Sequence, residues 1–179
     1  MDVLRGGALV EHVPEPMHVR WLQAAHDPAY VEAVMAAAVS TVIERRIGFP
    51  VTAEVARRAV LSPGGTWLAA KLALAHGYAA NAAGGSHHAL PDSGAGFCVF
   101  NDLAVAALRL LGEGDAKRIL IVDCDVHQGD GTAVILAGRN DVATLSLHAE
   151  KNFPVRKALS TMDVGLADRS EERRVGKEC

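Results

Sequence analysis

The sequence predicts an α/β fold with a mainly parallel sheet. Two nearly continuous apolar runs, residues 118–125 (RILIVDCD) and 141–148 (DVATLSLH), are predicted to be buried strands, because strands covered on both faces lack polar alternation. Segments with helical periodicity precede and separate them, and this alternation is typical of parallel sheets. A chain of 179 residues, 50 % of them hydrophobic, is long enough to form one such domain.

The first helix is predicted over Tyr30–Arg46. Val31, Val34, Ala38 and Val42 recur at helical spacing and would share one face of this helix. Charged side chains collect at its C-terminal end, and the sequence GFP follows it. We therefore expect a single helix with one side facing the core.

Two further helices are predicted on either side of a Pro-Gly-Gly sequence. Thr52 is expected to cap a short helix over residues 52–61, which ends before Pro63. The third helix covers Thr66–His76 and is ended by Gly77. Because this helix is almost wholly apolar, we expect it to be buried on several sides.

A glycine-rich segment, residues 81–102, is predicted to be a functional loop, since it is too rich in specific polar side chains for a simple linker. Asn101 or Asp102 is expected to cap a fourth helix over residues 103–114. A further helix, residues 132–138, lies between the two predicted strands. We find no internal repeat.

Composition limits the classes of partner and compartment. The formal net charge is −3, so no general basic surface indicates direct nucleic-acid or membrane binding. Cys98, Cys124 and Cys179 form neither a disulfide framework nor a CxxC metal motif, which favours a cytoplasmic location. Cys98 and Cys124 lie in apolar segments, and we expect both to be small buried residues.

Polar side chains follow the ends of the predicted strands, where ligands bind in parallel sheets. Asp125 and His127 are two residues apart, and their carboxylate and imidazole suit zinc, although iron or cobalt would also fit. A strand-end aspartate beside a solvated histidine is the simpler alternative. Asp123 ends the same run, and His148 either lines the site or caps the second strand.

His87 and His88 form a tandem pair inside the glycine-rich loop. Adjacent histidines can act as a general base and its electrostatic partner only if carboxylates set their pKa values apart. Asp123 and Asp130 are available for this orienting role. The alternative is a pair of loop histidines bonded to the backbone.

Several ordered blocks carry a family resemblance. GGSHHALPDSGAGFCVFNDLAVAA, VDCDVHQGDGTA, TLSLH and NFP together resemble the zinc-dependent histone deacetylase family over roughly residues 27–168. Gln128 and the segment NFPVRKALSTMDVGL are similar to the class IV-like bacterial branch. The resemblance implies the three-layer α/β/α arginase/deacetylase fold, incomplete in this chain.

The resemblance also implies roles for individual residues. Two of three zinc ligands correspond to Asp125 and His127. The catalytic histidines and their carboxylate partners correspond to His87, His88, Asp123 and Asp130. A structural K⁺ would lie near Asp123, Asp125, His127, Ser146 and Leu147. The walls of a narrow channel for an acylated lysine correspond to Gly96, Phe97 and Phe153. His26 and Asp27 belong to a family block remote from the zinc ligands and are expected to be structural.

The implied activity is zinc-dependent hydrolysis of the amide of acetyl-lysine or a related acetylated amine. We assign the base role chiefly to His88, with His87 as support, although the two could be reversed. Residues 1–168 are expected to form a catalytic domain shortened at both ends. Residues 169–179 (RSEERRVGKEC) resemble a translated sequencing adapter and are expected to be non-native.

The family's third zinc ligand, an aspartate, and its oxyanion-stabilising tyrosine are not found in this sequence. We therefore expect the chain as written to be inactive. Two alternatives remain open, a non-catalytic remnant or binding module of the same fold and a ureohydrolase-like manganese enzyme. The oligomeric state is not predicted.

Overall fold

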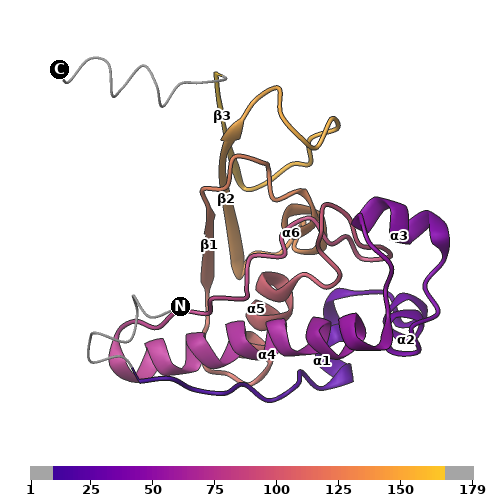
Figure 1. The fold of residues 1–179 in the computed structure, drawn as a ribbon. Coiled ribbons are helices and arrows are strands. Elements are labelled where there is room, and N and C mark those ends of the chain that lie inside the picture. Colours follow the sequence, from indigo (N-terminus) through magenta and orange to yellow (C-terminus); the bar gives the residue numbers. More distant parts are fainter. Residues whose placement is uncertain (1–9, 168–179) are drawn as a thin grey trace.

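The computed structural model describes residues 10–167, so the expected non-native tail lies outside the described residues. A three-stranded sheet stands at one end of the molecule and the helices gather beside it (Figure 1). The helices are α1 (Val19–Ala25), α2 (Pro28–Met35), α3 (Thr41–Ile47), α4 (Ala53–His76), α5 (Asp102–Gly112) and α6 (Asp130–Ile135). The strands are β1 (Ile119–Asp123), β2 (Val142–Ala149) and β3 (Met162–Leu166).

The sheet is parallel throughout, with strand order β1-β2-β3, which confirms the predicted α/β class. The register places Asp123 opposite Ser146, and His148 opposite Gly165. The carboxyl ends of all three strands therefore meet at one edge of the sheet, which is where a parallel sheet presents ligand-binding side chains.

The two faces of the sheet differ in burial. Ile121 and Val142 point inward and are buried, whereas the outward-facing Leu120 and Val122 are 62 % and 52 % exposed. Cys124 continues the outward series and is exposed, so the prediction that it is buried was wrong. The apolar sequence around it indicated burial, but the described residues leave that face uncovered.

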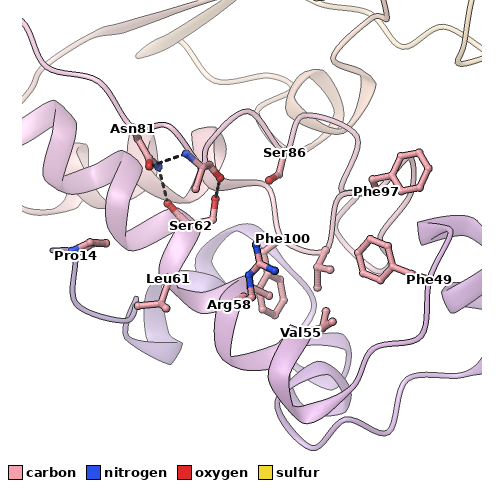
Figure 2. Close-up of a pocket in the computed structure, with 13 residues that line it drawn as sticks. Pro14, Phe49, Val55, Arg58, Leu61, Ser62, Asn81, Ser86, Phe97 and Phe100 are labelled. Carbon is pink, nitrogen blue, oxygen red and sulfur yellow. Dashed lines mark hydrogen bonds between the residues drawn. The ribbon is translucent and has the colours of Figure 1, made fainter. Parts of the chain in front are cut away.

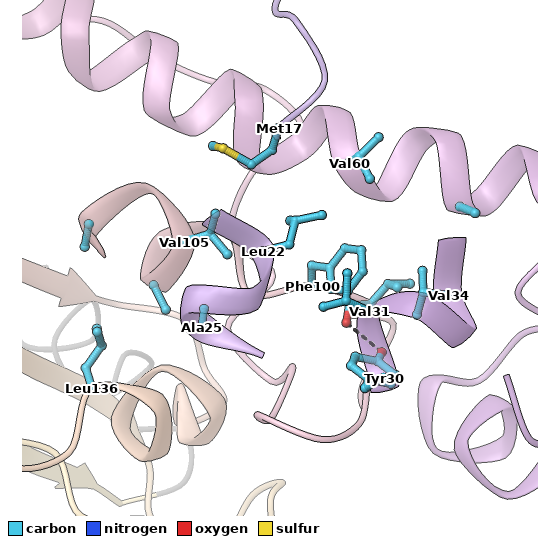
Figure 3. Packing of buried hydrophobic residues seen from close by; sticks show 14 of the residues in the cluster. Met17, Leu22, Ala25, Tyr30, Val31, Val34, Val60, Phe100, Val105 and Leu136 are labelled. Atoms are coloured by element: carbon cyan, nitrogen blue, oxygen red, sulfur yellow. Dashed lines mark hydrogen bonds between the residues drawn. The ribbon is translucent and has the colours of Figure 1, made fainter. Parts of the chain in front are cut away.

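The main core lies among α1, α2, α4 and α5 (Figure 3). Phe100, Leu22 and Val31 are almost completely buried there, and Val105 joins them from α5. Each such side chain contributes about 1.5–3 kcal/mol relative to leaving it in water. Among residues 10–167, no helix combines the length and apolarity that crossing a bilayer requires.

The predicted helix over Tyr30–Arg46 is wrong, because the structure divides it into α2 and α3. Ala37 adopts a positive φ of 51°, and Ser40 begins a new helix by accepting a hydrogen bond from a backbone N–H of α3. Of the predicted apolar face, only Val31 and Val34 are buried. The alanines at 36–38, between the two helices, are exposed and bury no apolar surface against the core.

The predicted break at Pro63 is also wrong, since α4 continues through the Pro-Gly-Gly sequence. The carbonyl of Val60 accepts a hydrogen bond from the backbone N–H of Met17 at 2.8 Å. A side chain on Gly64 would collide with the carbonyl oxygen of Glu15, because its Cβ would lie 2.1 Å away. Gly64 therefore allows the segment before α1 to pack closely against α4, and it does not end the helix.

The remaining elements follow the predictions with shifted boundaries. Asn101 caps α5 as expected, with Oδ1 accepting from the N–H of Ala104 at 3.0 Å. The helix predicted over 132–138 begins earlier, so that Asp130 lies in its first turn. α1 and β3 were not predicted, and β3 is largely exposed and lacks the apolar run of β1.

His26 joins the first helices to the glycine-rich loop. Its Nδ1 lies 2.9 Å from the carbonyl oxygen of Leu90, and its Nε2 accepts from the N–H of Asn101 at 2.9 Å. This pattern requires a neutral ring protonated on Nδ1. Burial lowers the pKa of His26 to about 4. As expected, the residue is structural, although its partner Leu90 follows His88 by only two residues.

We predict that the free energy of unfolding falls as the pH is lowered from 6.5 toward 4. Above pH 6.5 His26 is neutral in both states and its contribution is complete, whereas below it the unfolded chain takes up a proton that the folded chain excludes. Between pH 6.5 and pH values below 4, His26 alone should lower the free energy of unfolding by about 3 kcal/mol. Urea unfolding at several pH values measures it.

The matched variants are His26→Gln, which keeps a donor and an acceptor but does not titrate, and His76→Gln at the exposed end of α4. His26→Gln should flatten the pH dependence between 6.5 and 4, while His76→Gln should leave it unchanged. Equal pH profiles for His26→Gln and the unmodified chain would show that His26 is not the linked group.

Candidate functional site

The candidate site lies at the carboxyl edge of the sheet, in the turn between β1 and α6. Asp123, the last residue of β1, accepts a hydrogen bond from the N–H of Asp125 at 3.0 Å. Asp125 in turn accepts from the N–H of His127 at 2.8 Å. Each carboxylate thus fixes the backbone two residues ahead, and the polar side chains face one side of the turn.

Two histidine–carboxylate pairs form the centre of the site. His87 Nδ1 lies 2.6 Å from Asp123 Oδ2, and His88 Nδ1 lies 2.7 Å from Asp130 Oδ1. Both rings are buried, and their centroids are 4.0 Å apart. The structure therefore brings together the four residues that the sequence predicted to act as a catalytic group, with each histidine oriented by its own carboxylate.

The first pair is strongly polarised. Burial by itself lowers the pKa of His87, but the hydrogen bond to Asp123 and the nearby negative charges outweigh burial, and the pKa is raised. Burial likewise raises the pKa of Asp123, but hydrogen bonds from His87 and from the backbone of Asp125 outweigh it, and the pKa is lowered. The pair therefore favours an imidazolium beside a carboxylate.

Asp125 and His127 offer the donors of a metal site. Asp125 Oδ1 lies 3.0 Å from His127 Nδ1, and both side chains reach solvent. A carboxylate and an imidazole that converge on one point fit part of a zinc site, which in enzymes has three protein ligands. No group of three or more His, Cys, Asp or Glu side chains able to hold an ion occurs among residues 10–167. The described residues supply two donors.

The residues expected around K⁺ lie on β1, β2 and the following turn. Asp123 and Ser146 are partners in the sheet register, and Leu147 follows on β2. Ser146 Oγ is 3.0 Å from His148 Nδ1. His148 is buried within β2, and within the described part of the chain it forms no hydrogen bond to either histidine pair. The K⁺ site stays a prediction.

The three residues expected to line the channel, Gly96, Phe97 and Phe153, have different surroundings. A Cβ on Gly96 would lie 2.6 Å from His88 Cδ2, so only glycine fits there. Phe153 meets the ring of His88 edge-on at a centroid distance of 4.8 Å. Phe97 is 76 % exposed and stacks on Phe49 at 6.3 Å. Phe49 was not predicted from the sequence.

A cavity of about 460 Å³ adjoins the histidine loop (Figure 2). Phe49 and Phe97 form one end of it, Ser86 lines it next to the histidines, and Arg58 of α4 also borders it. None of the predicted catalytic or metal-binding residues lines this cavity. It is therefore a neighbour of the site and not its centre.

Gln128 is a second residue whose role the sequence did not reveal. It is fully buried, donates to Asp163 Oδ1 at 2.7 Å, and exchanges hydrogen bonds with the backbone of Ala158. It thus ties the turn carrying His127 to the segment that follows Phe153. Its position directly after a predicted metal ligand was the available signal.

Cys98 is buried, as expected, and burial raises its pKa to about 11. The thiol therefore stays protonated at neutral pH, and a redox or nucleophilic role is not supported.

Comparison with known proteins gives consistent matches. Residues 2–172 match the family described as histone deacetylase domain. An uncharacterized protein of Picosynechococcus sp. is 50 % identical over 148 residues, which are 83 % of this chain and 49 % of that protein. Histone deacetylase 2 of Arabidopsis thaliana is 41 % identical over 95 residues, which are 51 % of this chain and 24 % of that protein.

Among solved structures, the crystal structure of the HDA15 HD domain matches with a TM-score of 0.69 and 27 % identity. The match covers 84 % of this chain and 44 % of that one. The chain thus spans about half or less of the length of these three relatives.

We predict that Gly96→Ala displaces the ring of His88 and lowers the unfolding midpoint. Gly96 has a φ of +52°, and the added Cβ would meet the ring. The matched control is Gly138→Ala, which has a φ of +75° but no heavy atom within 4 Å of the new Cβ. Both carry about 1–2 kcal/mol of backbone strain, so any further destabilisation reports the collision.

Thermal unfolding and the NMR signal of the His88 Cδ2 proton measure the two effects. Only Gly96→Ala should move that signal. If both variants lose equal stability and the signal stays in place, the collision is absent.

Proposed function

The chain belongs to the histone deacetylase family, and from this membership we propose that its parent protein is a zinc-dependent hydrolase of the amide in acetyl-lysine or a related acetylated amine. The observation that carries the proposal is the double histidine–carboxylate arrangement, at 2.6 and 2.7 Å, beside the converging donors Asp125 and His127. Amide hydrolysis needs a base for water, an acid for the amine and charge stabilisation, and these groups provide the first two.

His88 is the proposed base. Its Nδ1 faces Asp130, and its Nε2 has no hydrogen-bond partner among residues 10–167, so we assign to Nε2 the proton taken from the attacking water and returned to the leaving amine. His87, polarised by Asp123, adds positive charge beside the reacting groups. Asp125 and His127 would hold zinc, which supplies Lewis-acid polarisation of the acetyl carbonyl when bound.

The channel residues fit an acylated lysine, which has an apolar stem and no charge. Phe153 stands beside His88, Gly96 leaves room for that ring, and Phe97 offers an exposed aromatic face. Aromatic faces suit such a stem. Acetylated protein and small acetylated amines both remain within this substrate class. The low net charge and the free cysteines support a cytoplasmic protein without direct nucleic-acid binding.

We further propose that residues outside this sequence are needed for full activity. The described residues supply two metal donors, and the family resemblance calls for a third aspartate ligand and an oxyanion-stabilising tyrosine. Loss of one oxyanion donor lowers kcat by about 10²- to 10³-fold. The two-donor set also favours a second candidate, a module of the same fold that binds acetylated ligands without hydrolysing them.

The deciding measurement is zinc-dependent release of acetate from an acetyl-lysine peptide, by this chain and by the longest product of its gene. In the longer product we expect His88→Ala to lower kcat by about 10²- to 10⁴-fold, because the general base is lost. Asp130→Asn should cause a smaller loss, since it leaves the imidazole in place without its orienting charge.

The control is Asp92→Asn, an exposed position on the same loop, which should retain full activity. Removal of metal by a chelator should abolish release, and added zinc should restore it. Binding of the peptide without any release of acetate would favour the binding module, and a fully active His88→Ala variant would exclude the proposed base.

A further inference from the structure

Asp102 is a fully buried carboxylate at the first position of α5. No cationic side chain among residues 10–167 forms an ion pair with it. Its oxygens accept hydrogen bonds from the N–H groups of Gly85 at 3.1 Å and Ser86 at 2.6 Å, and from the hydroxyl of Thr66. A buried charge needs such donors, and the start of a helix adds a favourable dipole.

The loop before the histidines is shaped around this carboxylate. A Cβ on Gly84 would lie 2.8 Å from Asp102 Oδ2 and 2.9 Å from Thr66 Oγ1, so a side chain there would collide with both. Gly85 has a φ of +92°, which L-residues rarely adopt. The two glycines of the sequence GGSHH therefore allow the backbone to wrap around Asp102.

The wrapped loop continues directly into the histidine pair. Ser86 precedes His87, and on the far side the side-chain amide of Asn101 donates to the carbonyls of His87 and Ala89, both at 3.3 Å. Asp102 and Asn101 thus hold the backbone on both sides of the histidines. Asp123 and Asp130 then orient the rings from other elements.

We propose that Asp102 is a positioning residue that acts through His87, and that Thr66 supports it by donating its hydroxyl. The carboxylate oxygens of Asp102 hold the N–H groups of Gly85 and Ser86 by hydrogen bonds. These hydrogen bonds fix the position of the backbone that leads into His87. They thereby also fix the 2.6 Å contact between His87 and Asp123. The consequence for hydrolysis rests on the proposed function, whereas the consequence for ring geometry does not.

The test uses NMR on the ¹⁵N-labelled chain, observing the imidazole N–H protons of His87 and His88 in their short hydrogen bonds. We expect Asp102→Asn to shift the His87 signal and to speed exchange of its proton with solvent by about tenfold or more, because local opening becomes easier. Asparagine keeps one amide oxygen but replaces the other acceptor oxygen by an NH2 group, so Gly85, Ser86 and Thr66 can no longer all donate to it.

Thr66→Val and Thr66→Ser form a milder matched pair. Valine removes the hydroxyl at similar volume and should shift the His87 signal in the same direction, while serine keeps the donor and should restore it. Asp92→Asn, an exposed change on the same loop, should have no effect. If Asp102→Asn does not fold, the threonine pair decides the question.

A folded Asp102→Asn or Thr66→Val variant with unchanged histidine signals would overturn the proposal, since loss of stability alone would indicate only a structural role. In the longer gene product, misplaced histidines should lower kcat by about 10- to 100-fold with KM nearly constant. Shifted signals in a product that hydrolyses no acetylated amine would uphold the positioning role and contradict the proposed function.

Discussion

Hydrogen bonds between the start of α5 and the loop before it hold the histidine pair in place. Asn101 caps α5 with its side-chain oxygen and binds the carbonyls of His87 and Ala89 with its side-chain nitrogen. Its backbone N–H binds His26, which also contacts Leu90. Asn101 therefore connects the start of α5, the junction between α1 and α2, and the loop that carries the histidines. Because these groups are buried, leaving any one unpaired costs about 1–3 kcal/mol.

The parallel sheet supplies the other half of the geometry. A short turn joins the carboxyl end of β1 to the start of α6, and Asp123 and Asp130 stand on either side of that turn. Thr132 of α6 donates its backbone N–H to the carbonyl of His87 at 3.1 Å. Adjacent histidines, with rings 4.0 Å apart, can therefore each meet a separate carboxylate. The crossover from strand to helix sets this spacing.

Local sequence signals predicted the parts of the fold that local forces determine. The apolar runs became β1 and β2, and Asn101 capped α5, because burial and capping act over a few residues. The predicted helix boundaries were wrong where contacts between residues far apart in the sequence are involved. α4 continues through Pro63, and the segment before α1 packs against it, with the N–H of Met17 bound to the carbonyl of Val60. Phe49 could not be found either, since it stacks on Phe97 from an unrelated loop.

The histidine and carboxylate motifs, together with the family resemblance, predicted which of these residues would lie together, but the residues that hold the histidine loop from below were not predicted. Asp102 next to a capping asparagine looks like a helix-start residue, and its carboxylate is in fact turned toward Gly85 and Ser86. The structure also separates the two histidines. Nε2 of His87 lies 3.9 Å from Asp125, so both ring nitrogens of His87 face carboxylates. Within residues 10–167, His88 pairs with one carboxylate, Asp130, and meets Phe153, and this asymmetry supports the base role proposed for His88.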